Sequence, residues 1–232
     1  MTEAPDTARP AWDTTKQEPG KWAQKRRLAD AMRLVIERLM PSDAPEAELR
    51  RAADALESYA DALAAHPRLH YAHGYAESAN AGDVGAFFDQ SPMIGLANPL
   101  APPMSMAKTG ERTAEGRVVF GSAYEGPPGH VHGGFVAAAF DEVLGFVQSL
   151  SGRPGMTGTL IVRYRRPTPL HTPLHFTAEY VRSEGRKLYT EARVHAGGVL
   201  CAEAEGIFVS IARERFEELE RQRAAREADR AR

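Results

Sequence analysis

The chain has 232 residues, of which 43% are hydrophobic and 26% charged, with a formal net charge of −2. This composition is typical of a globular protein, and the low net charge favours neither nucleic acid nor an anionic membrane as a partner. The longest apolar run, 135–140, is far shorter than the roughly 20 residues of a membrane span. The single cysteine, Cys201, excludes an internal disulfide and favours a reducing compartment. Since the N-terminus also lacks a secretory signal, we expect a cytoplasmic protein.

The N-terminal part of the chain is predicted to be an extension without chemistry. Residues 1–20 are rich in Pro, Thr, Asp and Glu without periodicity, which is typical of disorder. A helical hairpin is predicted over 21–68, because two stretches repeat apolar residues at helical spacing. The two apolar stripes are Leu28, Met32, Val35, Ile36 and Leu39 before Pro41, and Leu49, Leu56, Tyr59 and Leu63 before Pro67.

Residues 69–112 are predicted to be a covering loop. The segment SPMIGLANPLAPPM (91–104) has too many prolines for regular structure, yet many of its side chains are apolar. We expect it to cover one edge of a ligand groove, with Met93 and Leu96 contacting the substrate. A packed linker is the alternative interpretation.

Residues 103–212 show the pattern of an α+β domain. A short strand (116–122) is followed by an apolar helix (132–150), and then by four further strands. Because the helix is apolar nearly all round, we expect the antiparallel sheet to wrap around it. The four later strands are predicted at 156–164, 174–182, 187–195 and 200–211, and the tail at 213–232 is predicted to be a charged, solvated helix.

The stretch GHVHGGFVAAAFDEVLGFVQ (129–148) carries the residues best suited to chemistry. Gly133 and Gly134 begin the helix, where free backbone N–H groups can approach a carbonyl oxygen or a phosphate. Asp141 and Glu142 lie two turns further on, where a carboxylate among apolar side chains costs free energy. The pattern therefore predicts an oxyanion-binding group and a base.

Three segments together resemble the hotdog-fold acyl-CoA thioesterases, in particular the PaaI-like branch that includes the mammalian thioesterase-superfamily members. They are HGGFVAAAFDE (132–142), MTGTLIVRYRRPTPL (156–170) and CAEAEGIFVSI (201–211). The resemblance covers about residues 90–211 and implies a long central helix wrapped by an antiparallel sheet, here with an N-terminal helical extension. It also implies hydrolysis of a fatty or aromatic acyl-CoA, a role in lipid metabolism, and subunits paired through their sheets.

The resemblance assigns roles to the candidate residues. The Gly133 N–H would bind the oxyanion, with His132 as a second donor or only a helix cap. Asp141 would act as general base or as nucleophile, and Glu142 could replace it. Thr157 would orient the water or the carboxylate, with Thr159 as its rival on the same face of the strand.

Helix geometry requires two chains for one site. A helix rises ~1.5 Å per residue, so Gly133 and Asp141 lie roughly 12 Å apart on one helix. A base must approach within ~3 Å of its partner or act through one water. We therefore expect a composite site in a homodimer or homotetramer, built where two helices run antiparallel.

Other ligands and activities receive weaker support from the sequence. The cationic candidates for the phosphates of coenzyme A are Arg163, Arg165, Arg166, Arg186 and Lys187. We expect no metal and no cofactor, because Pro67 interrupts the one histidine cluster and no nucleotide-binding motif is present. A hydratase of the same fold is disfavoured by the nine-residue spacing of His132 and Asp141. A non-catalytic acyl-binding protein stays possible, because Gly126 stands where several family members carry a polar residue.

Overall fold

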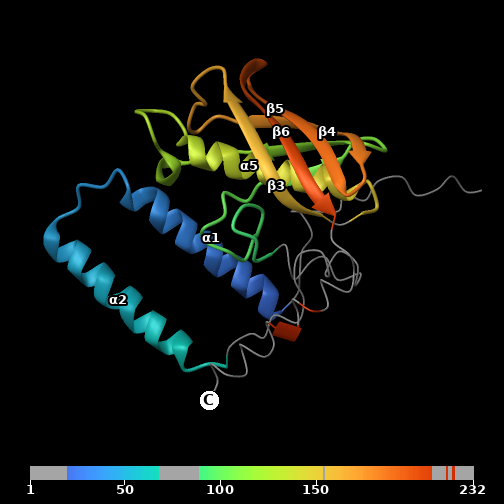
Figure 1. Ribbon diagram of the computed structural model, residues 1–232. Coiled ribbons are helices and arrows are strands. Elements are labelled where there is room, and N and C mark those ends of the chain that lie inside the picture. Colours follow the sequence, from blue (N-terminus) through green and yellow to red (C-terminus); the bar gives the residue numbers. More distant parts are fainter. Residues whose placement is uncertain (1–19, 68–88, 154, 211–217, 219–220, 223–232) are drawn as a thin grey trace, which may run out of the picture.

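The protein is described here from a computed structural model (Figure 1). The N-terminus predicted to be disordered, the first part of the covering loop and nearly all of the charged tail lie outside the described residues. No helix among the described residues is long and apolar enough to cross a membrane. The described residues are 20–67, 89–153, 155–210, 218, 221 and 222.

A six-stranded antiparallel sheet wraps around one long helix, α5, and this confirms the predicted α+β hotdog fold (Figure 1). The strand order is β1-β2-β4-β5-β6-β3, so β1 and β3 form the two edges. The helix and the last four strands begin and end within two residues of the predicted positions. The elements are β1 (Ser105–Lys108), β2 (Thr113–Val118), η1 (Ser122–Tyr124), α5 (Gly133–Ser149), β3 (Gly155–Tyr164), β4 (Leu174–Glu184), β5 (Lys187–Ala196) and β6 (Val199–Ser210).

The first two strands differ from the prediction. The covering loop was expected to extend to 112, but it contains β1, which pairs with β2 from Ser105↔Arg117 to Lys108↔Ala114. The strand predicted at 116–122 begins earlier and ends at Val118. It ends there because the following turn binds α1: the Ser122 N–H and hydroxyl both donate to the Glu37 carboxylate, at 2.8 and 2.9 Å.

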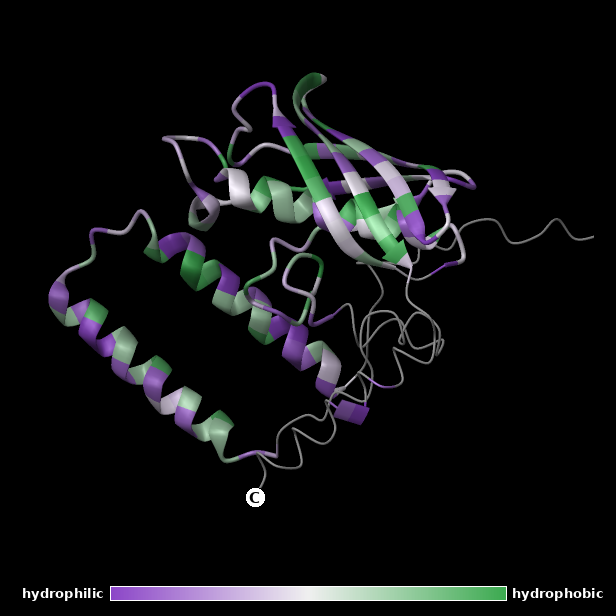
Figure 2. Ribbon diagram, in the orientation of Figure 1, coloured by the Kyte–Doolittle hydropathy of each residue, from purple (hydrophilic) through white to green (hydrophobic). Residues whose placement is uncertain are grey.

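The hydrophobic core lies between α5 and the inner face of the sheet. Phe140 on α5 meets Phe176 on β4 edge to face, with ring centroids 5.2 Å apart, and both side chains are fully buried. Each large apolar side chain buried in this way contributes roughly 1.5–3 kcal/mol. Figure 2 shows apolar and polar residues alternating along the strands, as expected for a sheet with one buried face. Cys201 belongs to this core as well.

Both predicted N-terminal helices are present, as α1 (Lys21–Leu39) and α2 (Glu46–Ala64). Polar contacts attach α1 to the domain: besides Glu37, Arg33 donates to the carbonyls of Asn98 and Leu96 at 2.6 and 2.9 Å. In contrast, α2 stands away from α1 and buries none of its residues (Figure 1).

The segment 89–104 lies between α1 and α5 (Figure 1). It packs as a series of turns whose side chains Met93 and Ile94 enter the hydrophobic core. Arg26 on α1 forms an ion pair with the buried Asp89 at 2.8 Å. The segment therefore joins the N-terminal extension to the helix that carries the candidate catalytic residues.

Candidate active site

His132 caps the N-terminus of α5. Its backbone is extended, and its Nδ1 accepts a hydrogen bond from the Gly134 N–H at 3.0 Å. Because an accepting Nδ1 carries no proton, the neutral ring has its proton on Nε2, which is then a hydrogen-bond donor. The cap therefore fixes the tautomer of His132 and occupies the N–H of Gly134.

Tyr164, at the end of β3, holds the other side of the same peptide group. Its hydroxyl donates to the Gly133 carbonyl at 2.7 Å, and burial raises the pKa of this hydroxyl, which keeps the donor protonated. A Cβ atom at Gly133 would lie 3.3 Å from the Tyr164 oxygen, so the glycine permits this close contact. The Gly134 N–H already donates to His132. The Gly133 N–H is therefore the donor in the first turn of α5 that suits a ligand, because a helix offers its first N–H groups no internal acceptor.

A pocket of about 390 Å³ opens at this end of α5. Arg165 and Arg166, two of the cationic candidates from the sequence, both line it. Arg165 forms an ion pair with Glu203, whereas Arg166 has no ion-pair partner among the described residues. The pocket is lined by Pro127, His130, Val131, Gly133, Val136, Tyr164, Arg165, Arg166, Pro167 and Thr168.

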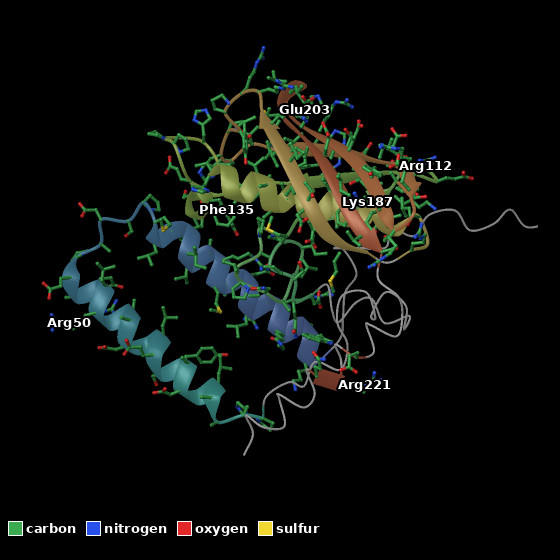
Figure 3. The ribbon with its side chains drawn as sticks, in the orientation of Figure 1. Arg50, Arg112, Phe135, Lys187, Glu203 and Arg221 are labelled. Carbon is green, nitrogen blue, oxygen red and sulfur yellow. The ribbon has the colours of Figure 1, made fainter. Side chains whose placement is uncertain are left out.

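The other cationic candidates lie elsewhere. Arg163 pairs with Glu205 on the neighbouring strand β6, and the Nε of Arg186 donates to the Ser210 carbonyl at 3.2 Å. Lys187 begins β5 and lies away from Glu203, the ion-pair partner of Arg165 (Figure 3). None of these three residues lines the pocket beside Gly133.

Asp141 meets Thr157 across the gap between α5 and β3. The Thr157 hydroxyl donates to Asp141 Oδ1 at 2.8 Å, and the carboxylate is half-buried. Oδ1 of Asp141 thus accepts from Thr157, and Oδ2 is the second acceptor oxygen of the carboxylate. The structure therefore brings together an acid and a hydroxyl that are sixteen residues apart in the sequence.

A β-bulge decides which threonine reaches the helix. The β3–β6 register shifts between Thr157 and Thr159, so Thr157 pairs with the buried Phe208 while Thr159 pairs with Ile207. Residues paired across a ladder share a face, and Thr159 therefore points away from α5. The expectation that the two threonines share one face is wrong, because the bulge at Gly158 reverses the alternation.

Glu142 has a different environment from the adjacent Asp141. It accepts a hydrogen bond from the Ser91 hydroxyl at 3.3 Å, and that hydroxyl accepts from the N–H groups of Met93 and Ile94. Burial raises the pKa of Glu142 to about 7, and the nearby Asp141 charge adds to the effect. A carboxyl group with a pKa of about 7 can take up and release protons close to neutral pH.

The two apolar candidates of the covering segment have structural contacts. Met93 is buried in the core cluster, and the carbonyl of Leu96, whose side chain is half-buried, accepts from Arg33. Neither residue lines the pocket beside Gly133.

Gly126 has a steric reason to be glycine. A Cβ atom there would lie 2.7 Å from His132 Cα, and its own N–H donates to the His130 carbonyl at 2.9 Å. The loop thus folds back against the helix cap. A polar side chain at position 126 would displace His132.

Comparisons with known proteins place these features in a family. Residues 128–202 match the family model described as Thioesterase superfamily. A crystal structure of a thioesterase superfamily protein is 35% identical, covers 84% of this chain and 94% of that chain, and has a TM-score of 0.73. The chain belongs to the thioesterase superfamily. The match to that crystal structure extends well beyond the region of the family model, so it includes more than the central helix and its nearest strands.

The curated relatives match a shorter part of this thioesterase superfamily member. Acyl-coenzyme A thioesterase THEM4 of Xenopus laevis is 32% identical over 93 residues, which are 39% of this chain and 42% of that protein. Acyl-coenzyme A thioesterase THEM5 of Homo sapiens is 31% identical over 93 residues, 39% of this chain and 38% of that protein. The chain thus spans less than half the length of the curated relatives it matches.

Proposed function

We propose that this thioesterase superfamily member hydrolyses acyl-CoA thioesters to a free acid and coenzyme A. One observation carries the proposal. α5 holds Asp141, which accepts a hydrogen bond from the Thr157 hydroxyl, and the same helix begins at Gly133, whose N–H has no acceptor within the helix. These are a base and an oxyanion donor, the two groups that thioester hydrolysis needs. The names of the curated relatives, acyl-coenzyme A thioesterases, support the same substrate class.

In this mechanism the helix N-terminus stabilises the developing negative charge. The thioester oxygen accepts from the Gly133 N–H, at the positive end of the α5 dipole. The hydrogen bonds from Tyr164 and to His132 hold the adjacent peptide group, so the donor is oriented before the substrate binds. The His132 Nε2–H is a candidate for the second donor. Losing one such donor typically costs ~10²–10³ in rate.

Asp141 supplies the base or the nucleophile. As a base, Asp141 removes a proton from water while the water oxygen attacks the thioester carbon. The C–S bond then breaks, and the leaving coenzyme A thiolate takes up that proton. As a nucleophile, its oxygen attacks the same carbon, and the C–S bond breaks as the coenzyme A thiolate leaves, which gives a mixed anhydride. Water then hydrolyses the anhydride to the free acid and the Asp141 carboxylate, and the proton released neutralises the thiolate. In both routes the Thr157 hydroxyl holds Oδ1 and directs Oδ2 toward the reacting atoms.

The proposed site is shared between two copies of the chain in a homodimer, or in a tetramer built from two such dimers. β3 is an edge strand, and its exposed apolar side chains include Met156, Ile161 and Tyr164. Exposed apolar edges favour pairing with another strand. A two-fold axis at Ile161 would make β3 pair antiparallel with its copy and would keep inward-facing residues opposite each other. Because Gly158 is bulged out of the ladder, that pairing brings Thr157 of one chain next to Tyr164 of the other.

This pairing explains why one chain separates the two halves of the site. Thr157 and Tyr164 are roughly 23 Å apart along one strand, at ~3.3 Å per residue. Because of the bulge, both side chains face α5, where Thr157 binds Asp141 and Tyr164 binds Gly133. The pocket at Gly133 of one copy would then face Asp141 of the other.

The pocket also supports an anionic substrate. Arg166 lines it without an ion-pair partner among the described residues, so its guanidinium is suited to a phosphate of coenzyme A. A fatty acyl-CoA substrate would place the reaction in lipid metabolism. The single buried cysteine fits a reducing compartment such as the cytoplasm.

Hydrolysis of acyl-CoAs of different chain length by the purified protein is the direct test. Asp141→Asn should lower kcat/KM by at least ~10²-fold, the lower range for general base catalysis, and leave the fold intact. Asp54→Asn, on the exposed α2, is the matched control and should have normal activity. Near-normal turnover by Asp141→Asn would contradict the proposal.

Mixing of inactive chains tests the shared site. Gly133→Pro removes the N–H at the first helical residue, a position where proline is tolerated. A mixed dimer of Gly133→Pro and Asp141→Asn chains has one intact site and one doubly altered site. We expect each mixed dimer to have about half of the wild-type activity, so random exchange of equal amounts of the two chains should restore about a quarter of the wild-type level. No recovery in proven heterodimers would show that each site lies within one chain.

A further inference from the structure

α2 carries an apolar stripe that none of the other described residues covers. Its larger side chains, Leu49, Leu56, Tyr59 and Leu63, are spaced at helical intervals and are 43–50% exposed. Small alanines lie among them, at positions 52, 53 and 60, so another helix can approach closely. In proteins most of the stability of a helix comes from packing of its apolar face, so a helix without one buried residue would be stabilised by a partner.

α1 has a second face that the described residues also leave exposed. Its polar contacts with the domain come from Arg26, Arg33 and Glu37. On a different face, Met32, Val35, Ile36 and Leu39 form an i, i+3, i+4, i+7 stripe that is 36–54% exposed. Figure 2 shows hydrophobic residues along both α1 and α2. Within the described part of the chain, two helices of equal length thus present apolar stripes without a partner.

The two helices carry opposite charge. α1 has six basic and two acidic side chains, a formal charge of +4, whereas α2 has five acidic and two basic side chains, a formal charge of −3. The acidic α2 disfavours an anionic lipid surface, because interfacial helices bind such lipids through basic residues. A basic helix with an apolar stripe is the complementary surface for α2, and this chain contains one.

We propose that the α1–α2 pair (residues 21–64) is a self-association surface. The apolar stripe of α2 packs against the exposed apolar stripe of α1 in a second copy, and the second copy returns the same contact. Such an exchange is self-complementary under two-fold symmetry and covers all four stripes. It uses a surface separate from β3 and from the proposed active site.

Cysteine cross-linking distinguishes a second copy from a fold-back within one chain. Val35 and Leu56 lie near the centres of the two stripes, and Cys201 is buried. Differently tagged Val35→Cys and Leu56→Cys chains, mixed and oxidised, should form a disulfide between the two tags. In the control mixture, Ser58→Cys on the opposite face of α2 replaces Leu56→Cys. This mixture should form at least ~5-fold less cross-linked dimer, because the thiol at position 58 faces away from the stripe.

Two cross-linking results would overturn the proposal. The Val35→Cys, Leu56→Cys double variant places both thiols in one chain; a fast-migrating monomer with an internal disulfide would show that α2 packs on its own α1. No 35–56 disulfide in either arrangement would show that the two stripes do not meet.

Hydrogen exchange of the α2 amides gives an independent measurement. In the wild type, contact with α1 of a second copy should protect these amides. Val35→Arg should raise their exchange rate at least ~10-fold, because a buried charge breaks the packed interface. Leu34→Arg is the matched control: Leu34 is 48% exposed and Val35 46%, but Leu34 lies on another face of α1. Unprotected α2 amides in the wild type, or equal effects of both variants, would overturn the proposal.

Discussion

α5 and α2 are helices of similar length, 17 and 19 residues, with opposite environments. α5 is apolar around most of its surface and buries eight residues against the sheet, whereas α2 has one apolar stripe and buries none. A helix enclosed in this way has fixed side chains, and α5 can therefore hold Asp141 and Gly133 in defined positions. The comparison shows that the pattern of apolar residues decides whether a helix carries a site or presents a surface.

The largest expected effect comes from removing a side chain at the centre of α5. Phe140→Ala should lower the free energy of unfolding by ~3–5 kcal/mol, because it leaves a cavity between α5 and β4. Leu56→Ala on α2 should change the free energy of unfolding of the dilute protein by less than ~0.5 kcal/mol. Urea denaturation of both variants measures the difference. Equal destabilisation would show that α2 is as well packed as α5.

Within the site, Thr157 should matter more than Thr159. Thr157→Val keeps the shape but removes the hydrogen bond to the Asp141 carboxylate, and bonds to charged groups contribute ~1.5–3 kcal/mol. We expect kcat to fall roughly 10–100-fold. Thr159→Val, on the other face of β3, should retain wild-type kcat. Equal losses in the two variants would contradict the assigned role of the bulge.

The pH dependence of stability should reveal Glu142. Its pKa is raised from 4.5 to about 7 by burial, so its ionisation favours the unfolded state. This contribution to stability is fully present below about pH 4.5 and is lost as the pH rises through about 7. The wild type should therefore lose roughly 1–2 kcal/mol more than Glu142→Gln between about pH 5 and 8. Parallel stability curves for the two proteins would show that Glu142 is not the titrating group.

The smallest expected effect concerns the hydroxyl that holds Gly133. Tyr164→Phe removes one hydrogen bond of ~0.5–1.5 kcal/mol and should lower kcat roughly 2–10-fold with little change in KM. Tyr189→Phe is the control, because its hydroxyl donates to the exposed Glu184 far from the pocket. A change in KM alone would show that Tyr164 contacts the substrate and does not orient the Gly133 peptide.

Much of this protein can be predicted from local sequence patterns. Alternating and helical periodicities predict α5 and the last four strands, because burial on one face constrains each element independently of its neighbours. The same patterns locate Gly133 at the start of α5 and Asp141 two turns inside it. Thr157 follows from the position of the next strand, although only the resemblance to a family gives it a role.

The remaining features depend on contacts between distant parts of the chain. The bulge at Gly158, which turns Thr157 toward α5 and Thr159 away from it, is a property of the β3–β6 register. The hydrogen bond of Tyr164 joins residues 31 positions apart, and that of Ser91 to Glu142 joins residues 51 positions apart. Periodicity in one element carries no information about such partners, because they are chosen by the packing of whole elements. For the same reason, the apolar stripe of α2 is visible in the sequence, while its exposure to solvent among the described residues is visible only in the tertiary structure.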